Sequence, residues 1–139
     1  MAKASGLGMT ALSVADASAA LQDIRADVTN FQWATPRGVQ DITGVDKFAF
    51  ERLLLLADLS LTLSAVYDNA ANKLHDVFKT VTTYNVGRAV TLTVNGTTLG
   101  TTPAIAMIAT DYAITRAQSG ELTASVPLSL SNGVIPTWT

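Results

Sequence analysis

Hydrophobic and polar residues alternate along several stretches of the chain, most clearly in GELTASVPLSLSNG, residues 120–133. The even positions from Leu122 to Leu130 are apolar, whereas the odd positions from Thr123 to Ser131 carry small and mostly hydroxylated side chains. A period of two residues is typical of a β-strand with one buried face. The second face is unusual, because exposed strand faces normally carry Lys, Glu and Arg, and this one is almost uncharged.

The same alternation predicts further strands at residues 10–14, 28–33, 59–67 and 88–94. Asn95-Gly96 follows the last of these and is a strong hairpin signal. Residues 104–117 are expected to be extended up to a turn at residues 118–120. Residues 16–25 predict a turn or a short helix, and residues 48–56 remain ambiguous between strand and helix.

One amphipathic helix is predicted at about residues 69–82. Its apolar residues Leu74, Val77, Phe78 and Val81 recur at i, i+3, i+4 and i+7, which places them on one face. Asp68 stands where its carboxylate can cap the first turn. A single flanking helix beside many strands indicates a mainly β fold, in which the helix packs on a sheet.

Two segments are expected to lack regular structure. ATPRGVQDITGVDK, residues 34–47, contains one proline, two glycines and two aspartates and therefore predicts a long loop. A loop of this length in a compact domain is usually functional. The glycine-containing N-terminus, about residues 1–9, is expected to be flexible.

A three-residue turn at 118–120 predicts the register of the last hairpin. It places Ala117 opposite Glu121 and Tyr112 opposite Val126. One face then carries Ile108, Tyr112, Ile114, Leu122, Val126, Leu128 and Leu130. The opposite face carries Ala109, Asp111, Ala113, Thr115, Thr123, Ser125, Ser129 and Ser131, which gives a smooth hydrophilic surface.

Composition places this pattern in one globular domain, because the chain has 139 residues of which 48% are hydrophobic. The net charge is −2 and the cationic residues are scattered, which excludes nucleic-acid binding through a basic surface. The chain contains no cysteine, so neither disulfides nor thiolate metal sites are available. We expect neither a signal peptide nor a membrane helix, because no apolar run has the required length.

Residues that often carry chemistry form no catalytic pattern here. His75 is the only histidine and is expected to be solvated on the helix surface. Trp33 and Trp138 are interpreted as packing or interface anchors. The carboxylates Asp41, Asp46 and Glu51 lack EF-hand spacing, and no phosphate-binding loop or nucleophile elbow is present. The sequence therefore predicts a protein that is not an enzyme and has no metal or cofactor.

The order of segments resembles the tail tube (major tail) protein family of long-tailed bacteriophages. The resemblance rests on the loop DITGVDKF, on LADLSLTLSAVYD followed at once by ANKLHDVFKTV, on the Asn-Gly hairpin, and on the terminal SVPLSLSNGVIPTW. It extends over nearly the whole chain. It implies a β-sandwich or split barrel with one flanking helix, a fold similar to the tube protein of type VI secretion. It also implies hexameric rings, stacked so that their inner sheets form one continuous barrel around a channel for DNA ejection.

The resemblance also implies roles for particular residues. The channel lining would comprise Asp111, Thr115, Glu121, Thr123, Ser125, Ser129 and Ser131. Together with the length of the loop, the resemblance predicts that the loop at residues 35–47 and the flexible N-terminus join one ring to the next. Within the loop, the residues predicted to do so are Arg37, Gln40, Asp41, Thr43 and Asp46. The chain would be a single tail-tube domain, residues 1–139, assembled in the host cytoplasm and located in the virion tail.

Its expected partners are other copies of itself, the tape measure protein and linear DNA passing without specific binding, and the tail terminator and tail tip proteins. No membrane is expected among its partners. The alternative is a monomeric β-sandwich module that binds or decorates a virion, whose smooth face is ordinary surface.

Overall fold

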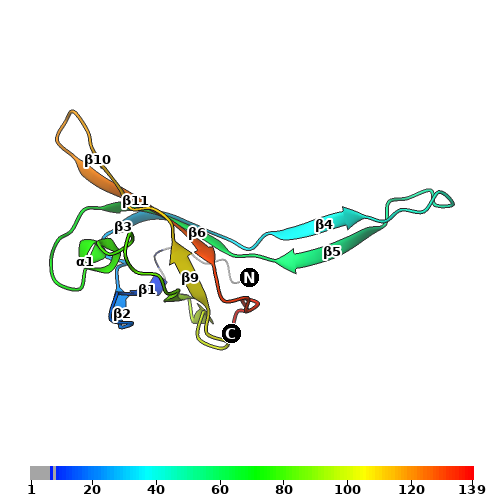
Figure 1. The fold of residues 1–139 in the computed structure, drawn as a ribbon, viewed down its shortest axis with the longest axis horizontal. Coiled ribbons are helices and arrows are strands. Elements are labelled where there is room, and N and C mark those ends of the chain that lie inside the picture. The colour runs from blue at the N-terminus through cyan, green and yellow to red at the C-terminus, as the bar shows by residue number, and fades with distance from the viewer. Residues whose placement is uncertain (1–6, 8) are drawn as a thin grey trace.

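The computed structural model describes residue 7 and residues 9–139. Within them, eleven strands and one helix follow in this order: β1 (Met9–Ala15), β2 (Leu21–Asp23), β3 (Val28–Ala34), β4 (Arg37–Asp41), β5 (Arg52–Ala57), β6 (Ser60–Val66), α1 (Leu74–Phe78), β7 (Arg88–Val94), β8 (Thr97–Leu99), β9 (Ala106–Ala109), β10 (Ala113–Arg116) and β11 (Leu122–Leu130). The expected flexible N-terminus lies almost wholly outside the described residues. A body of strands carries one long hairpin, β4 and β5, that extends far from it (Figure 1).

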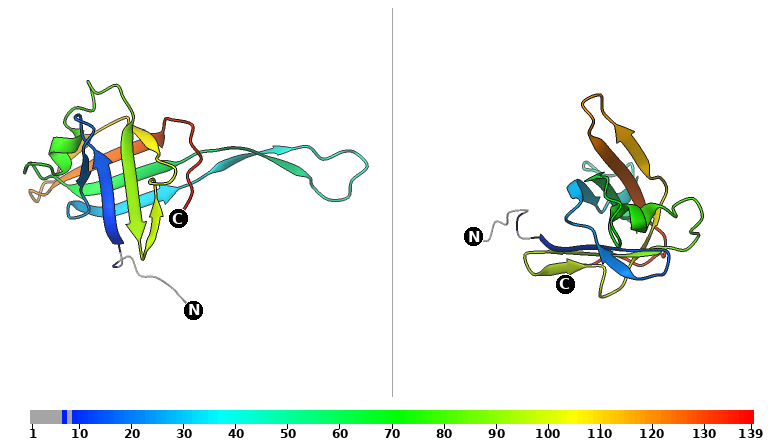
Figure 2. Two further views of the ribbon diagram at one scale, coloured as in Figure 1. Left: turned by 90° about the horizontal axis from the view of Figure 1, so that it is seen from below. Right: turned by 90° about the vertical axis from the view of Figure 1, so that its left-hand side faces the viewer.

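The body is one antiparallel sheet that folds over itself into two layers. The strand order is β2-β1-β7-β9-β11-β6-β3, with β8 paired to β7 and β10 paired to β11. β7 pairs with β1 along most of its length but with β9 at Arg88 and Ala89, so it belongs to both layers. Figure 2 shows β1 and β7 crossing the strands of the other layer. The predicted β-sandwich or split barrel with one flanking helix is confirmed.

The core lies between the layers and follows the predicted alternation. β6 contributes Leu61 and Leu63, and β11 contributes Val126 and Leu128, all buried, while the residues between them face outward or are only partly covered. The opposite layer contributes Leu12, Val14, Val90 and Leu92, and α1 contributes Leu74, Val77 and Phe78. The even face of residues 122–130 is therefore mainly the core face, as predicted.

The helix is shorter than predicted. α1 comprises only Leu74–Phe78, and turns take the place of helix on both sides, so Val81 lies outside it. Asn72 has a left-handed backbone with φ of 62°, which prevents an α-helix from passing through this position. Asp68 does not cap α1. Its carboxylate accepts the Ala70 N–H, and the Leu74 N–H donates to Asp27 instead.

Of the two alternatives for residues 16–25, the structure shows the turn: the Asp16 carboxylate accepts the N–H groups of Ser18 and Ala20 just before β2. One further expectation needs correction. The extended stretch 104–117 divides into β9 and β10, and the register shifts by one residue between them. Ile114 pairs with Ala124 as predicted, but Ile108 pairs with Ser129, so Ile108 lies on the polar face and Ala109 on the core face.

The predicted loop at residues 34–47 is instead half of a β-hairpin. β4 pairs antiparallel with β5, and this pairing continues the ladder between β3 and β6 beyond the body. The Asp58 N–H donates to the Pro36 carbonyl where the two ladders meet. Residues 28–66 thus form one long hairpin whose outer half, residues 37–57, is called the arm below (Figure 1).

Candidate assembly surfaces

The outward side of the layer formed by β3, β6, β11 and β10 is a broad uncharged surface. Residues directly opposite each other in an antiparallel pair share one face, so the register identifies its members. They are Asn30, Gln32, Ala34, Ser60, Thr62, Ser64, Val66, Ala113, Thr115, Thr123, Ser125, Pro127 and Ser129, together with Ile108 of β9. We call this set the smooth face. Every member is uncharged, and hydroxyl groups dominate its centre.

The smooth face ends at two open strand edges. β3 is the last strand of the sheet on one side, and β10 pairs only with β11 on the other. An edge strand presents unpaired backbone N–H and C=O groups that can pair with another chain. β3 carries no charged residue, β10 carries only Arg116 at its end, opposite Leu122, and neither strand contains a proline. Both edges therefore leave backbone groups that a strand of another chain could pair with.

The structure brings together four of the seven residues predicted for a channel lining. Thr115, Thr123, Ser125 and Ser129 all belong to the smooth face. Ser131 follows β11, and its hydroxyl donates to the Ala106 carbonyl.

The two predicted acidic members of the channel lining lie outside the paired strands. Asp111 occupies the break between β9 and β10, where its carboxylate accepts the Tyr112 N–H. Glu121 lies at the hairpin tip and accepts a hydrogen bond from the Ser119 hydroxyl.

The arm is a two-stranded ribbon with apolar side chains on both faces. Leu53, Leu54, Leu55 and Leu56 follow one another along β5 and are between 42% and 89% exposed. An uninterrupted apolar run is typical of strands that are covered on both sides, and an isolated two-stranded hairpin is at best marginally stable in water. Burying each leucine fully contributes about 1.5–3 kcal/mol. The arm therefore has the properties of an interface element.

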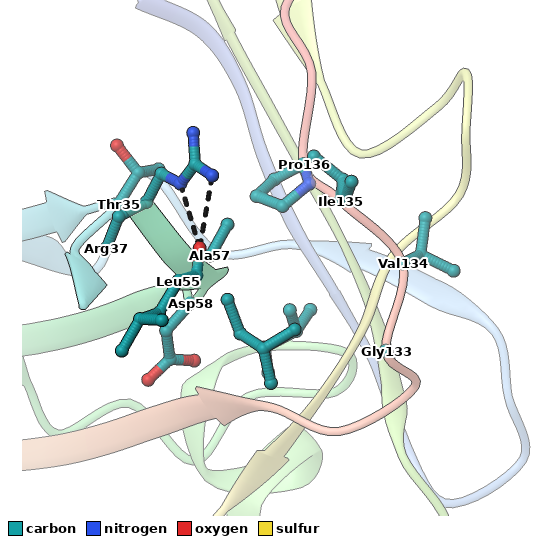
Figure 3. Close-up of a pocket in the computed structure, with 11 residues that line it drawn as sticks. Thr35, Arg37, Leu55, Ala57, Asp58, Gly133, Val134, Ile135 and Pro136 are labelled. Carbon is teal, nitrogen blue, oxygen red and sulfur yellow. Dashed lines mark hydrogen bonds between the residues drawn. The ribbon is translucent and has the colours of Figure 1, made fainter. Parts of the chain in front are cut away.

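An apolar groove lies where the arm leaves the body. Its volume is about 510 Å³, and its lining is formed by Thr35, Arg37, Leu55, Leu56, Ala57, Asp58, Leu130, Gly133, Val134, Ile135 and Pro136. Figure 3 shows Arg37 and Leu55 on one side of it and Ile135 and Pro136 on the other. The Arg37 guanidinium donates two hydrogen bonds to the Leu55 carbonyl, at 3.2 and 3.1 Å, which fixes the charged wall. We call this feature the root groove.

All five residues predicted to join rings lie on the arm. Arg37, Gln40 and Asp41 belong to β4, and Thr43 and Asp46 lie in the tip that connects β4 to β5. The Asp41 carboxylate accepts hydrogen bonds from the Thr43 N–H and hydroxyl, and these bonds, the side-chain bond first, lower the pKa of Asp41. The sequence interpretation missed the apolar part of the same segment, which the run LLLL and the two phenylalanines of FAF could have indicated.

A pair of carboxyl groups connects α1 to the body. Asp27 is buried and accepts the Leu74 N–H at 3.2 Å. Burial, and next a hydrogen bond with Asp68, raise the pKa of Asp27. The Ala70 N–H, and next Asp27, lower the pKa of Asp68. Of the two carboxyl groups, Asp27 therefore binds a proton more readily than Asp68.

The prediction that His75 is solvated on the helix surface is wrong. Its side chain is half-buried and packs between two tyrosine rings. Its Nδ1 lies 3.2 Å from the Tyr112 hydroxyl, and its ring centroid lies 5.1 Å from that of Tyr67. Burial raises the pKa of Tyr112 to about 12. Trp33 packs against the core, in agreement with a packing role. Trp138 forms a backbone bridge with Leu99, and its side chain is about half exposed.

In the part of the chain that the structure describes, no helix is long and apolar enough to cross a membrane. Residue 7 and residues 9–139 also contain no cluster of three or more acidic or histidine side chains that could hold a metal ion.

Comparison with known proteins identifies relatives by structure only. No family model and no curated protein matches the chain. A chain in the virion of a native gene transfer agent particle has a TM-score of 0.74 and 12% identity, with 99% of both chains covered. A chain in the tail of an empty gene transfer agent particle, computed with helical refinement in C6 symmetry, has a TM-score of 0.74, 11% identity and the same coverage. The fold expected from the resemblance to tail tube proteins is confirmed.

Proposed function

We propose that this protein is the structural subunit of a virion tail tube, in which hexameric rings stack around a channel for DNA. The observation that carries the proposal is the smooth face, a four-strand uncharged surface that ends in open edges on both sides. In a closed ring, the β3 edge of each copy would pair with the β10 edge of the next copy, and every smooth face would point into the channel.

The fold supports this assembly. Both structural neighbours belong to gene transfer agent particles, and one is a tail with C6 symmetry. If this chain takes the same place in its own particle as that neighbour takes in the C6-symmetric tail, six copies form one ring. The same neighbours support a virion tail as the location of the protein.

The chemistry of the smooth face suits the passage of DNA. Phosphates bind strongly to Arg and Lys, and each contact releases counterions and makes binding dependent on salt. Hydroxyl and amide side chains remain hydrated and give the polyanion no cation to pair with. A channel lined by Ser64, Ser125 and Asn30 in every copy would therefore be wet and non-adhesive toward DNA or a tape measure protein.

The arm supports stacking of the rings. It extends beyond the body (Figure 2). Its leucine side chains are exposed and contribute little to the core of their own chain. Contact with copies in the next ring would cover these side chains. The ends of such a stack would meet the tail terminator and tail tip proteins.

The experiment that tests the proposal is the mass and shape of the purified protein under assembly conditions, with tail components supplied. We expect a species of six subunits in mass measurement and tubes of uniform diameter in electron micrographs. A protein that remains monomeric under these conditions, including with tail components supplied, would contradict the tube and favour a monomeric decorating module.

A further inference from the structure

The tip of the arm presents a fully exposed apolar knob. Val45 and Phe48 have 109% and 108% of their reference surface exposed, and Phe50 has 71%. The loop that carries them is ordered by local bonds: the Lys47 N–H donates to the Gly44 carbonyl, and the Lys47 ammonium lies 3.4 Å from the Glu51 carboxylate. A phenylalanine held this far from the body makes no contribution to the fold of its own chain.

The root groove at the other end of the arm has the size and lining to receive such a side chain. Its volume of about 510 Å³ exceeds what a single phenyl ring needs, and leucine, valine, isoleucine and proline side chains form most of its walls. Aromatic side chains that fill apolar pockets are the usual energetic centres of protein interfaces. The groove therefore matches the chemistry of the knob.

Knob and groove cannot meet within one chain, because the extended arm separates them. Residues 37–46 in extended form span roughly 30 Å at about 3.3 Å per residue. We propose that Phe48 of one copy inserts into the root groove of a copy in the next ring. The inference rests on the proposed function and adds to it the identity of the receiving surface.

Charges around the two surfaces are complementary. Arg37 and Asp58 line the root groove, and neither belongs to an ion pair among the described residues. Asp46 flanks the knob, and its contact of 4.0 Å with Lys47 is at the limit of an ion pair, whereas Lys47 lies closer to Glu51, at 3.4 Å. Docking of the knob would allow Asp46 of one copy to face Arg37 of the other.

A contact from tip to root also has the right symmetry. It joins two different surfaces of the same chain, so it is heterologous and repeats from copy to copy without closing on itself. Edge pairing between β3 and β10 closes the ring, whereas the contact from tip to root extends the stack. The two interfaces thus give a tube both its closure and its length.

Disulfide trapping tests the contact, because the chain contains no cysteine of its own. We would assemble a variant with Phe48→Cys and Ile135→Cys, oxidise it, and separate it on a denaturing gel without reductant. The expected result is a ladder of covalent oligomers longer than dimers, since each copy links to one copy above and one below. The matched control combines Phe48→Cys with Val86→Cys, because Val86 is 65% exposed and Ile135 is 66% exposed. We expect no ladder from the control.

Tubes that give no ladder, or the same ladder as the control, would overturn the contact while leaving the tube itself established. If the double variant does not assemble, a density map of wild-type tubes decides the question. Phe48 must then lie within about 4.5 Å of Ile135 or Val134 of another copy, and any greater separation rejects the proposal. As a further measure, Phe48→Ser should raise the subunit concentration needed for tubes by about tenfold or more, with rings intact, and Phe48→Leu should restore most of the loss.

Discussion

At the residue scale, adjacent positions on β11 have opposite surroundings. Ser125 is exposed on the smooth face and pairs with Ser64 and Ala113, whereas Val126 is fully buried in the core. The pleat of the strand alone produces this difference. The two positions therefore separate the role of the proposed channel surface from the role of the core.

Substituting arginine at each of these positions should have different consequences. Ser125→Arg places a hydrated cation on a hydrated surface, so the subunit should fold and assemble, but DNA ejection should slow and the slowing should weaken as salt rises. Val126→Arg buries an unpaired charge and should cost about 4 kcal/mol or more, a large part of the stability of a domain. Urea unfolding and ejection kinetics measure the two effects, with Ser125→Asn as the uncharged control. Indistinguishable results from the two arginine variants would refute the assignment of faces.

The carboxyl pair at Asp27 predicts a pH dependence. The pKa of Asp27 is raised on folding, first by burial and then by Asp68, so the folded chain holds this proton more tightly than the unfolded chain. The stabilisation is therefore complete below the ordinary value of 3.8 and is lost as pH rises through the raised pKa. Asp68, with a lowered pKa, acts only below 3.8, in the opposite sense.

Asp27→Asn should remove the loss of stability that begins above pH 3.8, because asparagine does not titrate. Its amide oxygen can still accept the Leu74 N–H, and its amide N–H can still donate to Asp68. Urea unfolding of both proteins at pH values from 3.8 upward should show the variant gaining on the wild type as pH rises through the raised pKa of Asp27. Asp27→Ala serves as the control and should be less stable at every pH, since it leaves the Leu74 N–H unpaired. A difference between Asp27→Asn and the wild type that does not change with pH would exclude a raised pKa of Asp27.

At the scale of elements, the arm stands apart from every other strand pair. The contacts between β4 and β5 are local to the hairpin, and the arm's leucines contribute little to the core of their own chain. The stability of the body and the proposed stacking of rings should therefore be separable in this molecule. The side chains packed between the layers stabilise the body, and the arm is the element proposed to stack the rings.

Removing the arm should leave a folded subunit that does not stack. A deletion of residues 38–44 would be the natural test if this segment were a loop. Because most of β4 lies within it, that deletion would instead leave β5 without its partner strand. The suitable variant replaces residues 38–56 by a two-residue Asn-Gly turn, which suits the short antiparallel connection. We expect the free energy of unfolding to change by about 1 kcal/mol or less, because few core contacts are lost, and we expect no tubes in electron micrographs. Tubes of normal length from this variant would contradict the role of the arm.

At the scale of the whole molecule, the layer that carries the smooth face is open at β3 and β10. In the proposed tube, backbone pairing at these two edges would close the ring, and the arm would stack one ring on the next. The core strands β1 and β7 are already paired on both sides. Assembly should therefore change the surroundings of β3 and β10 and leave those of β1 and β7 unchanged.

Hydrogen exchange should detect this change. On assembly, amides in residues 28–34 and 113–116 should exchange more slowly, by about tenfold or more, because water loses access to the edges. Amides of β7 serve as the internal control and should keep the rates of the free subunit. Unchanged exchange at both edges in assembled particles would show that the ring closes through other surfaces.

Much of the fold followed from local patterns. The period of two residues identified the body strands and the core face of β11, because the pleat sends alternate side chains to opposite faces whatever the partner strand is. Asn95-Gly96 identified its hairpin, since both residues adopt the positive φ that such a turn requires. The three-residue turn also gave the correct register between Ile114 and Ala124.

Other features were decided only by tertiary structure. The one-residue register shift between β9 and β10 moves Ile108 to the polar face. The left-handed backbone at Asn72 shortens α1. The alternation of apolar and polar residues indicates neither feature. The arm was hidden because Pro36 and Gly38 suggested a loop and because an apolar run such as LLLL has no period. Which apolar faces meet, and which stay uncovered, depends on contacts between residues far apart in sequence. The sequence by itself therefore determined the alternation that makes a smooth face, whereas the path of the chain in space decided that an apolar arm and an apolar groove remain uncovered in the single chain.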